Sequence, residues 1–184
     1  MRYRKGQIHS IHLPLTIWHE MVCHCRRKLQ GDYLPGEGQS PKAFGLLGGK
    51  VAGAVMTIES VIPLLKNARD CGNQKCVVDS AMHLHAIPSE TPFDQRGWVA
   101  EAAELDTALT TLQTQGVRLV GNYHMHRVAW SHDLLRDTPT ELDTILGGDS
   151  RMFMFIISMV DPEVPRIRAF FEGIKDLELP VQII

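Results

Sequence analysis

The chain has 184 residues, 44% of them hydrophobic, and a formal net charge of −2 at pH 7. A chain of this size can bury a sizeable core without a disulfide framework, so we expect one domain over residues 1–184. The basic residues are scattered, which argues against nucleic-acid binding, and no apolar stretch approaches the roughly 20 residues that span a bilayer.

Cysteine usage and the N-terminal residues both favour a cytoplasmic location. The N-terminus lacks a signal-peptide core, and four cysteines are too few and too irregularly spaced for a secreted disulfide scaffold. We therefore expect free thiols. Two cysteines and two nearby histidines offer a four-ligand set whose spacing is not one of the usual zinc patterns: Cys71, Cys76, His83 and His85.

The first part of the chain predicts a strand, a helix and a pair of strands. Residues 7–13 alternate as in a strand, and residues 14–29 follow as a helix with proline in its first turn. A loop dense in turn residues covers 31–41. Buried strands are expected at 43–49 and 51–62, where glycines indicate that backbones approach closely.

The second part of the chain predicts a helix and further strands. Residues 66–92 show little pattern beyond a short strand at 76–78, whereas 98–115 have helical spacing that ends at a glycine. A strand at 117–123 follows this helix. Three more strands close the chain, at 152–160, 166–171 and 177–183. The mixture favours an α/β fold with a mixed β-sheet flanked by helices.

The most informative motif is a pair of histidines, His124 and His126, at the end of the strand over 117–123. Residues two apart on a strand project to the same side, and neutral imidazole nitrogens are good ligands for zinc. Catalytic zinc usually has three protein ligands and a water, so we expect a carboxylate from the connection that follows. Three aspartates compete for that position: Asp133, Asp137 and Asp143.

A helix start is predicted at residues 139–143, which read Pro-Thr-Glu-Leu-Asp. The Thr-x-x-Asp spacing of Thr140 and Asp143 is typical of a capping box, in which both side chains satisfy free backbone donors of the first helical turn. An aspartate fully engaged in such a cap would be a poorer metal ligand. Both interpretations can hold for Thr140.

Residues 119–126, followed by 139–143, resemble the JAMM metalloproteases, also called the JAB or MPN-plus family. The signature of that family is a glutamate, then His-x-His at a strand end, then Ser-x-x-Asp at a helix start. The resemblance extends over nearly the whole chain, with further similar segments at 43–49, 61–67 and 154–171. It implies a single-domain MPN/JAB-like fold of the bacterial type.

Carried over to this sequence, the resemblance implies Zn²⁺ held by His124, His126 and Asp143, with Thr140 in place of the family's serine to steady an oxyanion. Asp137 matches a spacing common in the family, but the helix start favours Asp143. The implied function is a zinc metallopeptidase or isopeptidase that acts on a peptide or on the tail of a ubiquitin-like or sulfur-carrier protein. The resemblance leaves open whether the protein forms a homodimer.

The sequence departs from the family at the catalytic glutamate, whose position is occupied by Lys42. In the family this glutamate takes a proton from the zinc-bound water, which an ammonium cannot do. Glu37 in the same loop is the nearest replacement, although a solvated loop charge is its simpler interpretation; Glu59, Glu101 and Glu104 are less well placed. The alternative function is therefore a non-catalytic MPN-like module for metal binding or protein interaction.

Overall fold

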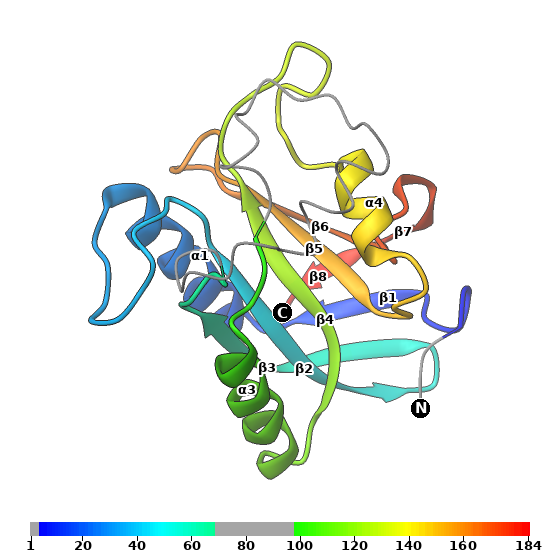
Figure 1. The fold of residues 1–184 in the computed structure, drawn as a ribbon. Coiled ribbons are helices and arrows are strands. Elements are labelled where there is room, and N and C mark those ends of the chain that lie inside the picture. Colours follow the sequence, from blue (N-terminus) through cyan, green and yellow to red (C-terminus); the bar gives the residue numbers. More distant parts are fainter. Residues whose placement is uncertain (1–3, 69–97) are drawn as a thin grey trace.

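The computed structural model describes residues 4–68 and 98–184 (Figure 1). The first part contains β1 (Ser10–Leu13), α1 (Leu15–Gln30), β2 (Phe44–Ala52) and β3 (Val55–Leu64). The second part contains α3 (Ala102–Thr114), β4 (Arg118–His126), α4 (Glu141–Gly147), β5 (Phe153–Ser158), β6 (Arg166–Phe171), a 3-10 turn (Lys175–Leu177), β7 (Glu178–Leu179) and β8 (Val181–Ile183). The short strand expected at 76–78 and the set Cys71, Cys76, His83 and His85 lie outside the described residues.

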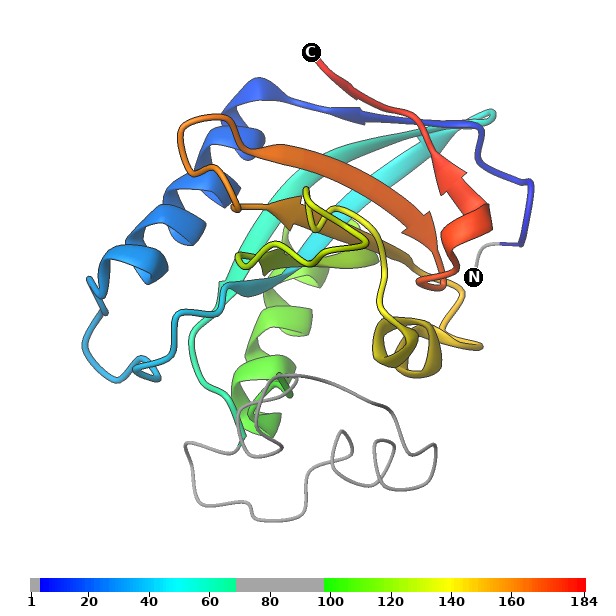
Figure 2. The same cartoon turned by 90° about the horizontal axis from the view of Figure 1, so that it is seen from above.

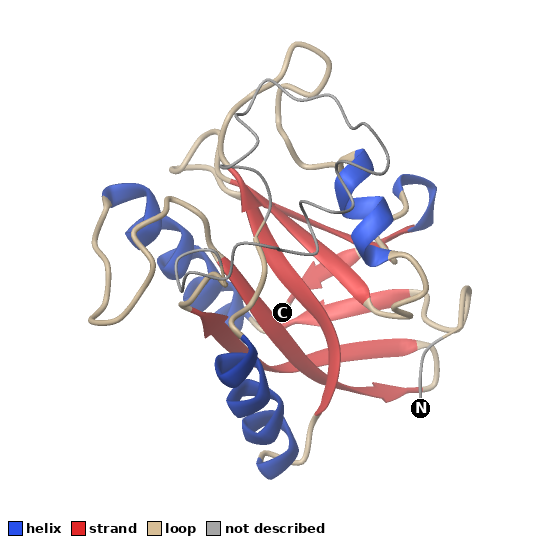
Figure 3. Cartoon of the chain, viewed as in Figure 1, coloured by secondary structure: helices blue, strands red, loops and turns tan. Residues whose placement is uncertain are grey.

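The strands form one mixed sheet in the order β7-β6-β5-β4-β2-β3-β1-β8. β1 runs parallel to β3 and β8, and β4 runs parallel to β5, while the other neighbours are antiparallel. Figure 3 shows the helices outside the strands, which confirms the predicted α/β class with a mixed sheet flanked by helices. β4, the strand with the histidine pair, lies in the middle of the sheet between β2 and β5.

The larger core lies on the face of the sheet that α1 covers. The sheet curls strongly, so that β6 approaches β8 from the far side, as Figure 2 shows from above. Met21 of α1 packs there with Tyr123 and Met125 of β4 and with Phe155 of β5, all buried. Because side chains alternate along a strand, His124 and His126 are turned to the opposite face.

The opposite face of the sheet is covered by α3 and α4. Leu112 of α3 packs on Leu46 of β2 in a second cluster, and Met154, Ile156 and Phe170 form a third. A hydrogen bond holds α4 to the residues that follow β6: the Thr144 hydroxyl donates to the Gly173 carbonyl at 2.7 Å. The histidines at the end of β4 thus lie on the same face as α4.

Two glycines allow the strands around the histidine pair to approach closely. A Cβ atom on Gly45 would collide with the Tyr123 ring, and one on Gly121 would collide with the carbonyl oxygen of Phe153 in β5. Such close approach is what glycine inside a strand often indicates. The side chain of Tyr123 therefore fits under β2 while its neighbour His124 faces the other way.

The structure corrects several element boundaries: the strand expected from residue 51 begins at Val55, because β2 continues to Ala52. The strand expected over 177–183 is divided at Pro180 into β7, which pairs with β6, and β8, which pairs with β1. Proline has no N–H to donate, and the Pro180 carbonyl instead accepts from the Ile11 N–H at 3.0 Å. The helix expected from residue 98 begins at Ala102, because the Glu101 side chain caps the first free N–H groups. Within 4–68 and 98–184 no helix is long and apolar enough to cross a membrane.

Candidate metal centre

The two histidines of β4 point at each other across one opening. The Nε2 atoms of His124 and His126 lie 3.0 Å apart. Backbone pairing places His124 in one row across the sheet with Phe44 of β2 and Ile156 of β5. The Phe44 ring stacks on His124 with a centroid distance of 6.2 Å, and Trp98 stacks on Phe44 at 4.6 Å. One flank of the pair is therefore walled by aromatic rings.

Asp143 reaches the histidines from the first turn of α4. Its Oδ1 lies 3.4 Å from the Nε2 of His124, and its Oδ2 lies 3.7 Å from the Nε2 of His126. Zinc at bond lengths of about 2.0–2.1 Å in a tetrahedral site holds its ligand atoms about 3.4 Å apart. The three side chains are the one group of potential metal ligands found among the described residues, and one ligand atom of each lies within 4.8 Å of the others.

Thr140 and Asp143 form the capping box that the sequence predicted, and the box leaves part of the carboxylate available. The backbone N–H and the hydroxyl of Thr140 each donate to Oδ2 of Asp143 at 2.7 Å, and the Asp143 N–H donates to the Thr140 hydroxyl oxygen at 3.2 Å. Oδ1 of Asp143 takes no part in the cap. Capping and metal binding are therefore compatible, because they use different oxygens.

His126 is oriented from behind by the connection that follows it. Its Nδ1 donates to the carbonyl oxygen of Arg136 at 3.0 Å, which leaves the Nε2 lone pair directed at His124 and Asp143. A second hydrogen bond of this kind is typical of metal-binding histidines, because it fixes the tautomer and the ring orientation. Burial lowers the pKa of His126 well below its usual value, and the neighbouring His124 adds to the effect, so the ring is neutral at pH 7.

The charge of Asp143 is set by competing influences. Burial favours the protonated acid, but the adjacent imidazoles and the two hydrogen bonds from Thr140 outweigh it and lower the pKa below the usual range. The site therefore offers a carboxylate and two imidazole nitrogens as potential metal ligands. This donor set is common in catalytic zinc sites.

The other two aspartates that competed for the third position are engaged elsewhere. Asp137 forms an ion pair with Arg168 of β6 at 3.1 Å. Asp133 accepts a hydrogen bond of 2.6 Å from the Thr138 hydroxyl and organises the turn around it. Neither aspartate belongs to the group of potential ligands. The spacing from His126 that favoured Asp137 in the sequence therefore does not identify the third member of this group.

Lys42 is brought to the same end of β4 by the pairing of β2. Phe44 lies opposite His124, and the Met125 N–H donates to the Ala43 carbonyl at 3.2 Å, which extends the register by one residue. The next position, Lys42, therefore lies opposite His126. Ala43 is buried in the core on the α1 face, and continued strand alternation predicts that Lys42 faces the side of the histidines.

Glu37 is neither a solvated loop charge nor close to the histidines. It is buried and accepts two hydrogen bonds from Arg27 and one of 2.8 Å from the Leu34 N–H, with Lys28 at 3.3 Å and His24 at 3.8 Å. Burial would raise the pKa of Glu37, but these donors and cations outweigh it and lower the pKa to about 2. His24 also contacts the Tyr123 hydroxyl at 2.7 Å, which places the cluster on the α1 face.

The remaining glutamates considered as a base have other partners. Glu59 forms an ion pair with Lys50 at 2.6 Å, and Glu101 caps α3. Glu104 accepts hydrogen bonds from the N–H groups of Leu65 and Lys66 at 2.7 and 2.9 Å. Each of the glutamates weighed from the sequence is therefore engaged in contacts away from the histidine pair.

Sequence reasoning missed the part that Arg136 plays. It lies in a polar connection with no motif, and only the folded chain brings its carbonyl to His126. The buried cluster around Glu37 was missed for the same reason, since its members come from a helix and a loop that look solvated in the sequence. No local pattern marks either feature.

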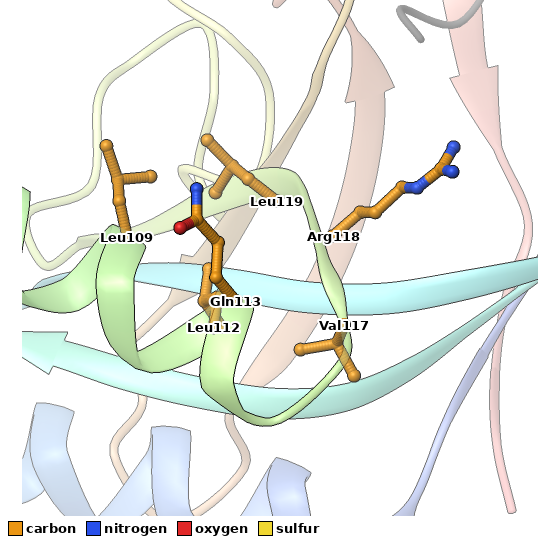
Figure 4. Close-up of a pocket in the computed structure, with 6 residues that line it drawn as sticks. All are labelled: Leu109, Leu112, Gln113, Val117, Arg118 and Leu119. Atoms are coloured by element: carbon orange, nitrogen blue, oxygen red, sulfur yellow. The ribbon is translucent and has the colours of Figure 1, made fainter.

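One pocket among the described residues is separate from the histidines. Figure 4 shows it between the end of α3 and the start of β4, lined by Leu109, Leu112, Gln113, Val117, Arg118 and Leu119. Its volume is about 380 Å³. Arg118 and His124 are six residues apart on one strand, which is about 20 Å. The lining offers no metal ligands, so the chemistry of the chain points to the other end of β4.

The chain is similar in structure to a protein from Desulfitobacterium hafniense: 22% of residues are identical, the match covers 95% of this chain and 93% of that chain, and the TM-score is 0.62. A protein from Salinibacter ruber matches with 18% identity, over 87% of this chain and 80% of that chain, at a TM-score of 0.48. No family model and no curated protein matches the sequence. The first likeness shows a shared fold and nothing of function.

Proposed function

We propose that this chain has an MPN/JAB-like fold and is a JAMM-like zinc metallopeptidase or isopeptidase that acts on a peptide or on the tail of a ubiquitin-like or sulfur-carrier protein. The observation that carries the proposal is the convergence of His124, His126 and Asp143 at distances suited to tetrahedral zinc. The order of these residues along the chain, a histidine pair at a strand end and an aspartate in a helix start, is that of the family.

The side chains around the site have separable tasks. When bound, zinc supplies Lewis acidity, which lowers the pKa of water and polarises a carbonyl group. The Arg136 carbonyl holds the His126 ring in place, and Thr140 holds Asp143. The family resemblance suggested that Thr140 steadies an oxyanion, but its hydroxyl proton is given to Asp143. We therefore assign Thr140 a positioning role.

Lys42 supports an alternative in which the metal is held without hydrolysis. It takes the place of the glutamate base at a position opposite His126, and Glu37 is committed to Arg27 on the other face. An ammonium cannot accept a proton from water. In this alternative the chain is a non-catalytic MPN-like module for metal binding or protein interaction.

The first experiment measures zinc content and cleavage together. Elemental analysis of the full chain is expected to give one zinc per molecule, with the metal lost in His126→Ala and retained in His19→Ala, a change at an exposed histidine of α1. Cleavage is assayed on fluorogenic peptide and isopeptide probes. A protein that binds no stoichiometric zinc, or whose cleavage survives His126→Ala, would contradict the proposal.

The second experiment separates the enzyme from the alternative. Lys42→Glu restores a carboxylate base, while Lys42→Gln removes the ammonium without adding a base. Zinc-dependent cleavage by the parent protein supports the enzyme. Cleavage in Lys42→Glu alone, with an inactive parent and an inactive Lys42→Gln, supports a metal-binding module derived from an enzyme. Inactivity of all three, with zinc bound, also favours the module.

A further inference from the structure

The side chain of Arg136 is largely buried, and its charge acts on the candidate metal centre. Arg136 is only 9% exposed, and its Cζ lies 3.4 Å from the centre of the Trp130 ring. No ion pair links it to any residue within 4–68 and 98–184, and its buried Nε has no hydrogen-bond partner among them. A buried cation without a hydrogen-bonded anion is costly, so such an arrangement requires an explanation.

The position of Arg136 is tied to the site through its own backbone. Its carbonyl oxygen accepts the hydrogen bond from His126 Nδ1 at 3.0 Å, so the arginine is adjacent to a candidate ligand. Its φ is +47°, a left-handed conformation that costs free energy for a residue with a side chain. The Arg136 N–H donates to the Asp133 carbonyl at 3.2 Å, which helps to hold this turn.

The charge of Arg136 acts on the site and is affected by it. Burial lowers the pKa of Arg136, and the carboxylates of Asp133 and Asp143 act in the opposite direction without contacting it. The guanidinium remains charged at any pH of interest. It therefore offers a fixed positive charge that acts on His126 and has no ion-pair partner in the part of the chain that the structure describes.

We propose that Arg136 is the carboxylate-binding residue of this site, taking a carboxylate that a peptide ligand carries beside the bond at the metal centre. A guanidinium presents two parallel N–H donors that match the two oxygens of a carboxylate, and its hydrogen bonds to a charged partner are among the strongest in proteins. Trp130 holds the plane of the guanidinium by stacking and shields it from water.

The carboxylate can come from the free C-terminus of a peptide or from an acidic side chain, and the chemistry that Arg136 recognises is the same. This inference rests on the proposed function, because it assigns the ligand to the substrate of that site. Carboxylate binding itself does not need zinc. Binding to zinc-free protein therefore tests Arg136 independently of whether the site binds metal or cleaves anything.

The experiment follows the ¹H–¹⁵N signal of the Arg136 Nε–H in zinc-free protein labelled with [¹⁵N]arginine. Three probes are compared: N-acetyl-glycylglycine, with a free terminal carboxylate; N-acetyl-glutamic acid amide, with a side-chain carboxylate; and N-acetyl-glycylglycine amide, with none. We expect saturable shifts of the signal with one or both carboxylate probes and no shift with the amide. The carboxylate probe that shifts the signal identifies the source of the carboxylate, a free C-terminus or an acidic side chain.

Variants of Arg136 test the paired N–H donors of the guanidinium separately from its positive charge. Arg136→Lys keeps a cation but loses the paired donors, and it is expected to weaken binding of the carboxylate probe about tenfold or more by calorimetry. Arg127→Lys, at an exposed arginine of the same connection, is expected to stay within about twofold of the parent. If Arg136→Lys does not fold, the shift of the Arg136 Nε–H signal in the parent protein still tests whether Arg136 binds a carboxylate.

Three results would overturn the assignment. One is an equal shift of the Nε–H signal with the amide probe. Another is the absence of any shift with either carboxylate. The third is tighter binding of inorganic phosphate than of the carboxylate probes, because a guanidinium also matches phosphate and the site would then belong to a different class of ligand.

Discussion

The Nε2 atoms of His124 and His126 lie 3.0 Å apart, and Asp143 Oδ1 lies 3.4 Å from the first of them. Two ring nitrogens this close share either a proton or a cation, because their lone pairs would otherwise repel. Since His126 Nδ1 already donates to Arg136, its Nε2 is the acceptor in either case. The geometry around these atoms leads to three predictions about stability and metal affinity, and the buried cluster around Glu37 on the other face leads to a fourth.

Zinc is expected to stabilise the fold through these three side chains. Saturation at about 100 times the dissociation constant adds about 2.7 kcal/mol to the free energy of unfolding, which raises the Tm of a chain of this size by about 5–10 °C. The rise should vanish in Asp143→Asn. In Asp137→Asn it should persist from a lower starting Tm, because that change breaks the ion pair with Arg168. Differential scanning calorimetry measures both, and an unchanged rise in Asp143→Asn would argue against Asp143 as a ligand.

Removing the Thr140 side chain should weaken both the helix cap and the metal site. Thr140→Ala is expected to cost about 1 kcal/mol in urea unfolding, because the Asp143 N–H loses its acceptor. Zinc affinity should fall about tenfold or more, since Asp143 loses one of the two hydrogen bonds that orient it. Thr140→Ser retains the hydroxyl and serves as the control. Competition with a zinc-binding dye reports the affinity, and an alanine variant with normal affinity would refute the positioning role.

The buried cluster around Glu37 should make stability depend on acid pH. The pKa of Glu37 is about 2 in the folded chain against an ordinary 4.5, so the folded state binds fewer protons than the unfolded state between these values. The stabilisation from Glu37 is therefore fully present above about pH 5 and is lost as the pH falls toward 2.

The variant Glu37→Gln isolates this contribution. At pH 7 it is expected to lower the free energy of unfolding by about 3 kcal/mol, because Arg27 and Lys28 lose the carboxylate they face. The difference between parent and variant should shrink as the pH is lowered from 5 to 3 in parallel urea titrations. A difference that stays constant over this range would show that the charge of Glu37 is not what stabilises the loop.

Gly121 should not tolerate a methyl group. In Gly121→Ala the added Cβ meets the Phe153 carbonyl oxygen, so β4 and β5 must separate, at a cost of about 2–3 kcal/mol. Because this pairing carries both histidines, zinc affinity should fall as well. Gly148→Ala is the matched control, since the nearest atoms to its Cβ are at an ordinary 3.5 Å. Equal stability of the two variants in urea unfolding would contradict the close packing of β4 on β5.

Much of this fold followed from local patterns. The alternation before His124, the helical spacing ahead of Gly116 and the Thr140-Asp143 cap each depend on neighbours within a few residues, and the structure places a strand, a helix and a helix start there. The same periodicity failed at Pro180, because whether a proline divides a strand depends on which strands lie on either side of it.

The sequence by itself determined the secondary structure around the site and the types of side chain that could hold a metal. Only the tertiary structure decided among Asp133, Asp137 and Asp143, since the choice depends on where a connection of 14 residues between β4 and α4 turns back. The tertiary structure also shows that Glu37 is paired with Arg27 away from the site. Arg136, next to the site, has no ion-pair partner among the described residues. Burial and pairing of charges are long-range properties, set by which distant segments the fold brings together, and no local pattern encodes them.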